Sequence, residues 1–459
     1  ARIDAVAGQV PRSWHPGMGP EVEAAKEGLL AAAQDDRERE ALEAAWALDG
    51  HPRHLSVHPG GVVIAPGPLT DLVPLQLAAK GVIITQYDLH SIERLGLVKI
   101  DLLGIRALTV VAESVELVRR RQPDISREVA DGDVATGDLL AVADTIGCFQ
   151  TESPGMRRTL RELGSRTLED VMVALALYKP GPLRGGLKDA FVRRHRGEEP
   201  ARYLHPALIP ILESTHGVVL YPEQVLRIAH ELAGFSLGEA DRLRRAIAHL
   251  GHGDEMLPLR EGFIERVGQV SGVPPEVAAR LWEMMASFAG YGFLKAHAAS
   301  YAAVAYQTAY LKAHHPAEFM TALMRNWGGY YPWRVYLGEA RRMGMEVRPP
   351  HVNHSGRRFR LEYQPDGRAV LWMGLGQVRE LTRKTIAALL DAAQEGPFRS
   401  LDDLLERASP RLAEVENLIK AGGLDGLGAG RTALLADLGV RSPSAPLQLA
   451  LPLSWAGEA

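Results

Sequence analysis

The sequence predicts an α+β protein that is predominantly helical, and three observations lead to this class. Short β-branched segments bounded by Gly or Pro occur within residues 61–103 and again within 345–373. Between these two regions, residues 138–325 show a helical pattern interrupted by glycine and proline. Residues 374–440 are helical again, with paired-glycine turns. A length of 459 residues suggests about three domains.

The individual elements follow from local composition. Residues 20–48 are rich in Ala, Leu and Glu, with Pro only at the start, which predicts a helix with an acidic solvent face. Residues 61–66 and 96–103 are short and β-branched, which predicts strands. The other elements expected are helices at 106–121 and 298–313, a helix starting around Leu237, and strands at 358–363 and 369–373.

Composition excludes several classes of protein. Hydrophobic residues make up 46% of the chain and charged residues 24%, which argues against global disorder. The single cysteine, Cys148, excludes an intramolecular disulfide framework. No apolar run approaches the ~20 residues of a membrane helix, and no signal-peptide pattern opens the chain. We therefore expect a soluble, cytoplasmic protein. Because residue 1 is Ala, the chain is expected to be processed or cut from a longer one.

The net charge of −4 hides an uneven distribution. Residues 21–50 hold nine acidic and three basic residues, a local charge of −6. Residues 157–196 hold ten basic and four acidic residues, a local charge of +6, and most of the basic residues are Arg. Arginine binds phosphate through two parallel hydrogen bonds. This segment is therefore either a phosphate-binding surface or an ordinary solvated face.

The segment GLVKIDLLG places a carboxylate on a predicted strand. Alternation puts Lys99 and Asp101 on one face, and Val98, Ile100 and Leu102 on the other. A carboxylate presented in this way could hold Mg²⁺, which prefers oxygen ligands. An exposed Lys–Asp pair without function would give the same pattern.

Many stretches of the chain, in order, resemble bacterial replicative DNA polymerases of family C, the alpha subunit of DNA polymerase III. The matching stretches are HPGGVVIAP (58–66), TQYD (85–88), GLVKIDLLGIRALT (96–109), FQTESPGM (149–156), KPGPL (179–183), HPAL (205–208), GVVLYPEQV (217–225), AGFSLGEADRLRRA (233–246), FAGYGFLKAHAASYA (288–302) and KAHHPAEFM (312–320). The resemblance covers nearly the whole chain. It implies a partial nucleotidyltransferase-like palm, helical fingers and C-terminal helix-hairpin-helix units.

In that family, three Asp residues of the palm hold two Mg²⁺ ions for template-directed transfer of a dNTP to a primer 3′-OH. The resemblance assigns the third Asp to Asp101, as catalytic residue and metal ligand, and a neighbouring basic role to Lys99. The first two Asp residues belong to an upstream PDxDxD-type motif that this chain lacks before Asp101. Asp131 and Asp133 have similar spacing but follow Asp101 in a loop context. We therefore expect no polymerisation by this segment alone.

The resemblance places nucleotide-binding residues in the fingers. Arg244 and Arg245 match a pair thought to contact the phosphates of the incoming nucleotide, although a basic helix end also suits the macrodipole. Tyr291, Lys295 and His297 match the nucleotide pocket, and Phe293 could stack on a base. A helix-initiating turn with core aromatic residues would give the same pattern.

Other basic residues and glycines are candidates for DNA binding. Each of the segments 373–390 and 416–435 fits a helix-hairpin-helix unit, in which hairpin amides and a helix N-terminus grip phosphate without reading bases. Ordinary capping of helices by glycine is the alternative. The candidate DNA-binding residues are Lys179, which stands where the family commonly has Arg, together with Arg193, Arg194, Gly374, Gly376, Gly428 and Arg431.

The tail segment QLALPL, residues 448–453, resembles the short clamp-binding peptide of bacterial polymerases. In such peptides Gln and spaced Leu residues fill a groove on the sliding clamp. The residues concerned are Gln448, Leu449, Leu451 and Leu453. Plain hydrophobic residues of a flexible tail are the alternative.

The expected domains are the end of the thumb (1–50), the C-terminal part of the palm (51–118), the fingers (119–340), a small mixed segment with tandem helix-hairpin-helix units (341–440) and a flexible tail (441–459). The resemblance implies primer–template DNA, dNTP, a sliding clamp and other replisome subunits as partners, and no membrane. The replicative and error-prone types are not separated by these residues. A non-catalytic protein that binds DNA and the clamp, derived from a polymerase, is the competing function.

Overall fold

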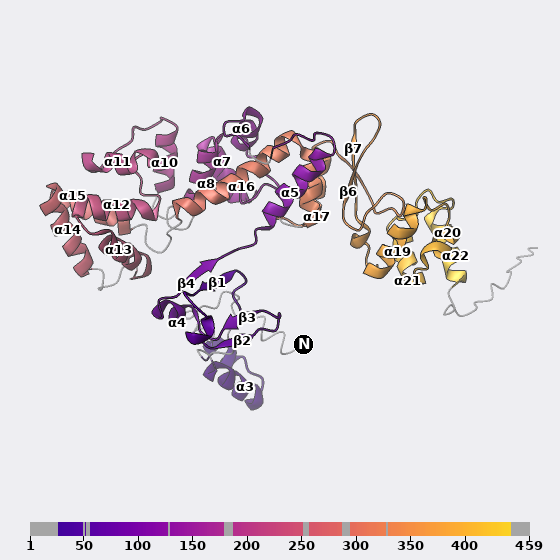
Figure 1. Cartoon of the computed structure of the whole chain (residues 1–459), viewed down its shortest axis with the longest axis horizontal. Coiled ribbons are helices and arrows are strands. Elements are labelled where there is room, and N and C mark those ends of the chain that lie inside the picture. The colour runs from indigo at the N-terminus through magenta and orange to yellow at the C-terminus, as the bar shows by residue number, and fades with distance from the viewer. Residues whose placement is uncertain are drawn as a thin grey trace, which may run out of the picture. The chain divides into compact units, whose positions relative to one another are not determined.

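The computed structural model of the chain divides into two compact units, Ala1–Gly104 and Ile105–Ala459, each of which is described by itself (Figure 1). The structure describes residues 26–48, 51, 56–126, 129–178, 187–250, 257–286, 294–326 and 329–441. As the sequence predicts, the protein is mostly helical with small sheets. No described helix has the length and apolar character needed to cross a membrane.

The first unit contains two small antiparallel sheets, β1–β4 and β2–β3. Its elements are α3 (Asp36–Ala47), β1 (Gly61–Ile64), a 3₁₀ turn (Leu69–Asp71), β2 (Leu75–Leu77), β3 (Ile83–Thr85), α4 (Leu89–Arg94) and β4 (Val98–Asp101). The predicted strands at 61–66 and 96–103 are confirmed, although each contains only four residues, Gly61–Ile64 and Val98–Asp101. Asp88 begins α4, because its carboxylate accepts a hydrogen bond from Ser91 N at 2.9 Å.

The single helix predicted over residues 20–48 is wrong in its described part. Residues 26–31 are helical, the chain then turns at 32–35, and α3 begins at Asp36. The break has a local cause, since the side chain of Asp35 accepts a hydrogen bond from Glu38 N at 2.8 Å. Asp favours helix N-caps because it competes for backbone N–H groups in this way.

Helices dominate the second unit. They are α5 (Arg106–Arg119), α6 (Val134–Ala141), α7 (Pro154–Leu163), α8 (Leu168–Leu177), α10 (Leu187–His195), α11 (Ile209–Leu212), α12 (Pro222–Ala233), α13 (Leu237–Leu250), α14 (Leu257–Ser271), α15 (Pro275–Ala286), α16 (Lys295–His314), α17 (Pro316–Asn326), α18 (Trp333–Arg342), α19 (Arg383–Gln394), α20 (Leu401–Ala408), α21 (Leu412–Lys420) and α22 (Arg431–Val440), with 3₁₀ turns at Pro206–Leu208, Glu213–Thr215 and Leu375–Gln377. The predictions of helices at 106–121 and 298–313, and of a helix start at Leu237, are confirmed.

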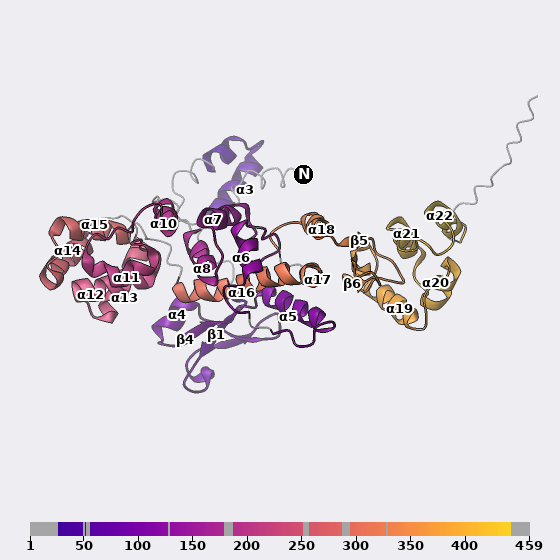
Figure 2. The same cartoon turned by 90° about the horizontal axis from the view of Figure 1, so that it is seen from above.

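The 20-residue helix α16 runs against α6, α8, α5 and α17 (Figure 2). Alanines recur along its buried stripe at Ala298, Ala302, Ala305 and Ala309, with spacings of three and four residues. Small side chains at this spacing allow neighbouring helices to approach closely. The buried Tyr306 lies on the same helix, and its hydroxyl accepts the backbone N–H groups of residues 132 and 133 at 3.1 Å.

Three further cores complete the second unit. Helices α11 to α15 enclose one of them, around Phe263 and Trp282. Another joins α5, α17 and α18 to a sheet of order β5–β7–β6, in which β5 (Glu346–Arg348) pairs parallel and β6 (Arg360–Tyr363) antiparallel to β7 (Ala369–Trp372). The last core packs α19 to α22 around Leu404 and Leu418. The strands predicted at 358–363 and 369–373 are therefore confirmed.

Candidate functional site

Asp101 ends strand β4, directly opposite Gly61 of β1. Lys99 lies two residues earlier on the same face, and its ammonium donates a short hydrogen bond to the Asp101 carboxylate. The ring of His58 is also near, with Nδ1 3.7 Å from Asp101 Oδ1. The hydrogen bond from Lys99 lowers the pKa of Asp101, so the carboxylate is ionised at neutral pH. With 46% of its side chain exposed, Asp101 remains open to an approaching ligand.

The described residues near Asp101 do not by themselves fit a magnesium site. Asp101 contributes one carboxylate, and its two close neighbours are Lys99, a cation, and His58, a nitrogen donor. Mg²⁺ prefers several oxygen ligands in octahedral geometry. Within the described ranges, no cluster of three or more His, Cys, Asp or Glu side chains is arranged to hold a metal. Further oxygen ligands must therefore join Asp101 if a metal is to bind here.

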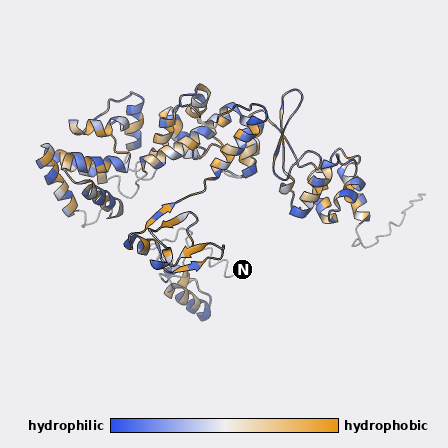
Figure 3. Cartoon of the chain, in the orientation of Figure 1, coloured by the Kyte–Doolittle hydropathy of each residue, from blue (hydrophilic) through white to orange (hydrophobic). Residues whose placement is uncertain are grey.

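The opposite face of the β1–β4 sheet is apolar and exposed. The strand register pairs Val62 with Ile100 and Ile64 with Val98, so all four side chains lie on this face. Each of them is more than two-fifths exposed. Figure 3 shows the strands of this unit in the hydrophobic colours. Exposed apolar surface on a two-stranded sheet is unusual, because such a sheet needs a covering layer for stability.

On α13, the predicted nucleotide-binding arginines share one carboxylate. Asp241 accepts hydrogen bonds from Arg244 Nε at 2.9 Å and from Arg245 Nε at 2.8 Å. The bond from Arg244 is the main reason that the pKa of Asp241 is lowered. The side chain of Arg245 is 68% exposed and that of Arg244 is 25% exposed. The two arginines and Asp241 together carry one net positive charge. Arg245 is largely exposed, so its other guanidinium N–H groups can bind an anion.

Lys295 and His297 lie in the first turn of α16 and are exposed. Lys295 contacts α12: its backbone N–H donates to Glu223 Oε1 at 3.1 Å, and its ammonium lies 5.7 Å from the centre of the Tyr221 ring. The His297 ring packs 4.3 Å from that of Tyr301. The Glu223 carboxylate therefore lies at the N-terminus of α16, where a negative charge is favourable beside the positive end of the helix dipole.

The remaining predicted residues of the fingers differ in accessibility. Arg193 is half exposed and pairs with Glu199 at 3.1 Å. Arg194 is only 13% exposed, because its guanidinium donates to the backbone oxygen of His216 at 2.9 Å. Arg194 is therefore held largely by internal contacts. Lys179, Tyr291 and Phe293 lie outside the described residues.

The second predicted hairpin runs from α21 to α22 through residues 421–430. Gly428 has φ +100°, a conformation that favours glycine. Arg431 opens α22, and its guanidinium forms a two-pronged ion pair with Asp425 of the turn. This ion pair holds the turn against the helix, but it also occupies part of the Arg431 side chain.

The first predicted hairpin differs, because its glycines make room for backbone. A Cβ on Gly374 would lie 2.6 Å from the backbone oxygen of Arg357, and one on Gly376 would lie 2.9 Å from the same oxygen. Gly376 N also donates to this oxygen at 3.0 Å. These two glycines therefore serve the packing of the turn at Leu375–Gln377 before α19. The four residues of the tail motif, Gln448, Leu449, Leu451 and Leu453, lie outside the described residues.

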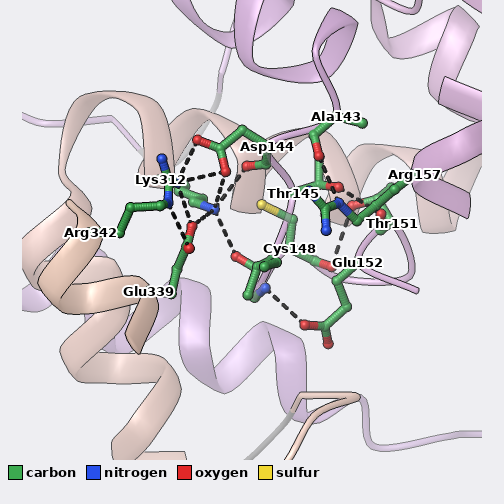
Figure 4. Close-up of polar contacts among 12 residues, drawn as sticks. Ala143, Asp144, Thr145, Cys148, Thr151, Glu152, Arg157, Lys312, Glu339 and Arg342 are labelled. Carbon is green, nitrogen blue, oxygen red and sulfur yellow. Dashed lines mark hydrogen bonds and ion pairs between the residues drawn. The ribbon is translucent and has the colours of Figure 1, made fainter. Parts of the chain in front are cut away.

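A buried ionic network, not anticipated from the sequence, centres on Lys312 of α16 (Figure 4). The ammonium donates to Glu339 Oε1 at 2.6 Å, to Asp144 O at 2.8 Å and to Ile146 O at 2.9 Å. Arg342 completes the network by binding both carboxylates. Lys312 belongs to the KAHHP motif, but its polar partners are 27 to 168 residues away. A lysine in an otherwise apolar helix stripe is the one sequence feature that could have indicated a buried ion pair.

The network is electrostatically balanced. Burial alone would raise the pKa of Glu339, but hydrogen bonds from Arg342 and Lys312 outweigh it and lower the pKa to about 2. Burial also raises the pKa of the nearby Cys148 thiol to about 12. Cys148 is therefore an unreactive core thiol. The network joins α16 to α18 and to the loop after α6.

Comparison with known protein families assigns the same order of regions. A family model for the "Bacterial DNA polymerase III alpha NTPase domain" matches residues 1–104. A model for the "Bacterial DNA polymerase III alpha subunit finger domain" matches residues 107–270, and a "Helix-hairpin-helix motif" matches 344–434. The chain belongs to the family of bacterial DNA polymerase III alpha subunits and error-prone DNA polymerases. The resemblance inferred from the sequence is thereby confirmed.

Curated members of this polymerase family align along most of the chain. The DNA polymerase III subunit alpha of Thermus aquaticus is 42% identical over 419 residues, 88% of this chain and 33% of the relative. The error-prone DNA polymerase of Symbiobacterium thermophilum is 38% identical over 469 residues, 95% of this chain and 42% of the relative. The DNA polymerase III subunit alpha of Escherichia coli is 37% identical over 423 residues, which cover 88% of this chain and 36% of the relative. The chain thus spans about a third to two-fifths of the length of these relatives.

Proposed function

We propose that the chain is part of a DNA-directed DNA polymerase of the DNA polymerase III alpha type, which transfers nucleotides from dNTPs to a primer 3′-OH. The observation that carries this proposal is the position of Asp101. It lies within the region matched by the NTPase-domain model, on an open strand face, and Lys99 donates a hydrogen bond to its carboxylate. Such polymerases act on the chromosome, which implies the bacterial cytoplasm.

In this proposal, Asp101 is one of three metal-binding carboxylates, and the other two come from outside this chain. Together the three carboxylates would hold two Mg²⁺ ions, and this pair of metals would supply activation of the primer hydroxyl and charge stabilisation of the leaving pyrophosphate. Lys99 orients the Asp101 carboxylate and lowers its pKa further. Arg245 and Arg244, with Lys295, His297 and Tyr291, bind the incoming nucleotide. Arginine donors already fixed by Asp241 require little reorganisation to receive phosphate.

The two hairpins and the basic helices are proposed to hold primer–template DNA. Gly428 lies in the exposed turn before α22, and Gly374 and Gly376 shape the turn before α19 by packing against the Arg357 backbone; the starts of these two helices are proposed to bind phosphate. Arg431, Arg193 and Lys179 add positive charge, while Arg194 supports them from its internal position. The tail residues 448–453 are proposed to bind the sliding clamp, through which other replisome subunits are reached.

The test is complementation. The chain is mixed with a separate polypeptide carrying the preceding palm segment of a relative, and primer extension is measured with Mg²⁺ and dNTPs. We expect extension that falls more than about 100-fold with Asp101→Asn, since even residues that only support a metal ligand contribute 10- to 100-fold. Asp71→Asn, an exposed carboxylate of the same unit, is the matched control and should have no effect. Extension unaffected by Asp101→Asn would contradict the proposal.

A second candidate function is a polymerase-derived protein that binds DNA and the clamp without catalysis. The observation that favours it is the single carboxylate at the described site. The two functions differ in one result: a non-catalytic protein binds primer–template DNA tightly but gives no extension in the complementation assay. Clamp binding is tested with a peptide of the tail, which should lose affinity when Gln448 and Leu451 are changed to Ala.

A further inference from the structure

A cavity of about 370 Å³ lies in the second unit where the start of α7 meets the end of α8 and the segment before α18. Its wall includes two tyrosines, Tyr178 and Tyr330, together with Phe149, Gln150 and Ser153. Ligand cavities typically measure about 300–1,000 Å³, so this one is large enough for a single aromatic ring system with its sugar. None of these side chains was among the sequence-predicted site residues.

The rear wall of the cavity is rigidly built around the buried carboxylate of Glu152. Its two oxygens accept hydrogen bonds from Gly147 N at 2.8 Å, from Tyr330 N at 2.5 Å and from the Tyr336 hydroxyl at 3.0 and 3.2 Å (Figure 4 shows Glu152). Burial raises the pKa of Glu152 in spite of these donors. Because donors from three places converge on this side chain, it fixes the backbone that carries the Tyr330 ring.

The two tyrosine rings are exposed, although the structure positions them. Tyr330 is 65% exposed and Tyr178 is 38% exposed. Gly155, in the first turn of α7, makes room for the second ring, because a Cβ there would lie 2.2 Å from the Tyr178 hydroxyl. Large aromatic side chains that a fold holds in place and leaves exposed are typical of stacking surfaces for flat ligands.

The polar and charged groups around the cavity indicate which kind of flat ligand it can bind. Gln150 is exposed in the left-handed region, with φ +58°, and its amide offers both a donor and an acceptor to the edge of a base. The helix that begins at the cavity, α7, carries three arginines outside the cavity wall. Arg158 pairs with Glu162 and Arg157 donates to Ala143 O at 2.9 Å, so the exposed Arg161 contributes most of the positive charge on this helix. Aromatic rings combined with nearby positive charge are the features by which proteins bind single-stranded nucleic acid.

We infer that this cavity binds a nucleobase of single-stranded DNA, stacked on Tyr330 and Tyr178, with the strand's phosphates beside α7. The inference rests on the proposed function, since it names a subsite for the unpaired strand of the DNA substrate. Stacking of the base on the tyrosine rings does not depend on the DNA sequence. Attraction between the arginines and the phosphates of the DNA strand weakens as the salt concentration rises.

The experiment measures binding of a labelled 12-nucleotide oligothymidine to the full chain by fluorescence anisotropy. We expect Tyr330→Ala to weaken binding roughly tenfold, the magnitude for loss of one stacked base, and Tyr330→Phe to keep affinity within about twofold. Tyr87→Ala is the matched control, because Tyr87 is an exposed tyrosine that does not line this cavity. Tyr330 is exposed and donates only its backbone N–H to Glu152, so its variants should fold.

An abasic oligonucleotide of the same length separates stacking from charge. The wild type should prefer oligothymidine to the abasic strand by about the same factor, and this preference should disappear in Tyr330→Ala. Unchanged affinity of Tyr330→Ala, or a preference that persists in it, overturns the inference. Competition by dTTP that depends on Tyr330 would assign the cavity to a free nucleotide and overturn the single-strand assignment. If the wild type binds primer–template duplex but not oligothymidine, this inference fails while the proposed function stands.

Discussion

Strands β4 and β7 are both four residues long, yet their surroundings are opposite. β7 is the central strand of its sheet, and three of its four side chains are buried. β4 has a single partner strand, and three of its four side chains are exposed. The same difference extends to whole units: only four described hydrophobic side chains of the first unit, Leu29, Val73, Ala78 and Ile92, are buried, whereas the second unit contains four hydrophobic clusters.

This difference indicates that the second unit is stabilised more by its own buried apolar contacts than the first unit is. The second unit buries enough apolar surface to form complete cores around α16, α12 and α20. Among its described residues, the first unit presents exposed apolar side chains on its strands, and the catalytic candidate Asp101 lies on one of these strands. In the proposed function, further polypeptide covers this sheet and supplies the other metal ligands.

The largest expected effect compares two lysines that each pair with a carboxylate. Lys312→Met should destabilise the second unit by about 3–5 kcal/mol, because it leaves the buried carboxylate of Glu339 without its ammonium. Lys99→Met, the matched change at the exposed Asp101, should alter stability at the limit of measurement. Hydrogen exchange of peptides from α16 and β4 measures both effects. Equal loss of protection at the two sites would contradict the comparison.

Acid should loosen the second unit around the buried network of Glu339 and Lys312. The lowered pKa of Glu339, about 2, means that its ion pairs stabilise the fold fully above the unfolded pKa near 4.5. This contribution, of the order of 3 kcal/mol at most, is lost as the pH falls from about 4.5 to 2. Hydrogen exchange at pH 5.5 and pH 3, corrected for the intrinsic rate, should show loosening of α16 and α18. In Lys312→Met the additional loss on acidification should be much smaller, and an undiminished loss would exclude this network as the cause.

Substituting one valine on each strand tests the difference between β7 and β4. Val370→Thr on β7 places a hydroxyl in a fully buried position and should cost about 1–3 kcal/mol. Val98→Thr on β4 should be nearly neutral in this chain, because its side chain is 57% exposed. Urea unfolding followed by tryptophan fluorescence gives both values. In the complemented polymerase the cost at Val98 should rise if the missing palm segment covers this face, and an unchanged cost would mean that the segment binds elsewhere.

The smallest expected effect is in the second hairpin. Gly428→Ala should cost about 1 kcal/mol, because the residue has φ +100° while a Cβ there has open space around it. Gly439→Ala, near the end of α22, is the matched control and should be neutral or slightly stabilising. Thermal unfolding monitored by circular dichroism gives both values. Equal stability of the two variants would show that the turn does not require its left-handed residue.

The elements that the sequence predicted correctly depend on local pattern, whereas β2, β3 and α4 of the first unit were not predicted. The strand at Asp101, the α16 helix and the strand alternation at Lys99 all follow from neighbouring residues. The break before α3 was missed, since one capping carboxylate, Asp35, outweighed a continuous helical composition. The hydrogen-bond partners of Lys312 and Glu152 could not be predicted from the sequence, because these partners belong to distant segments that only folding brings together.

For the candidate site, the sequence predicted which residue types take part better than it predicted where their side chains lie. Asp101 and Lys99 are adjacent, as strand alternation required. The pairing of Arg244 and Arg245 with Asp241 also follows from helical spacing. The internal position of Arg194 does not, because its contact with the backbone oxygen of His216 depends on a loop 22 residues away.

The central claim is that this chain holds one catalytic carboxylate of a polymerase whose remaining ligands lie elsewhere. Primer extension by the purified chain alone, with Mg²⁺, dNTPs and a primer–template to which the chain binds, tests this claim most directly. The account predicts binding without any extension. Robust extension by the chain alone, lost in Asp101→Asn and kept in Asp71→Asn, would contradict it.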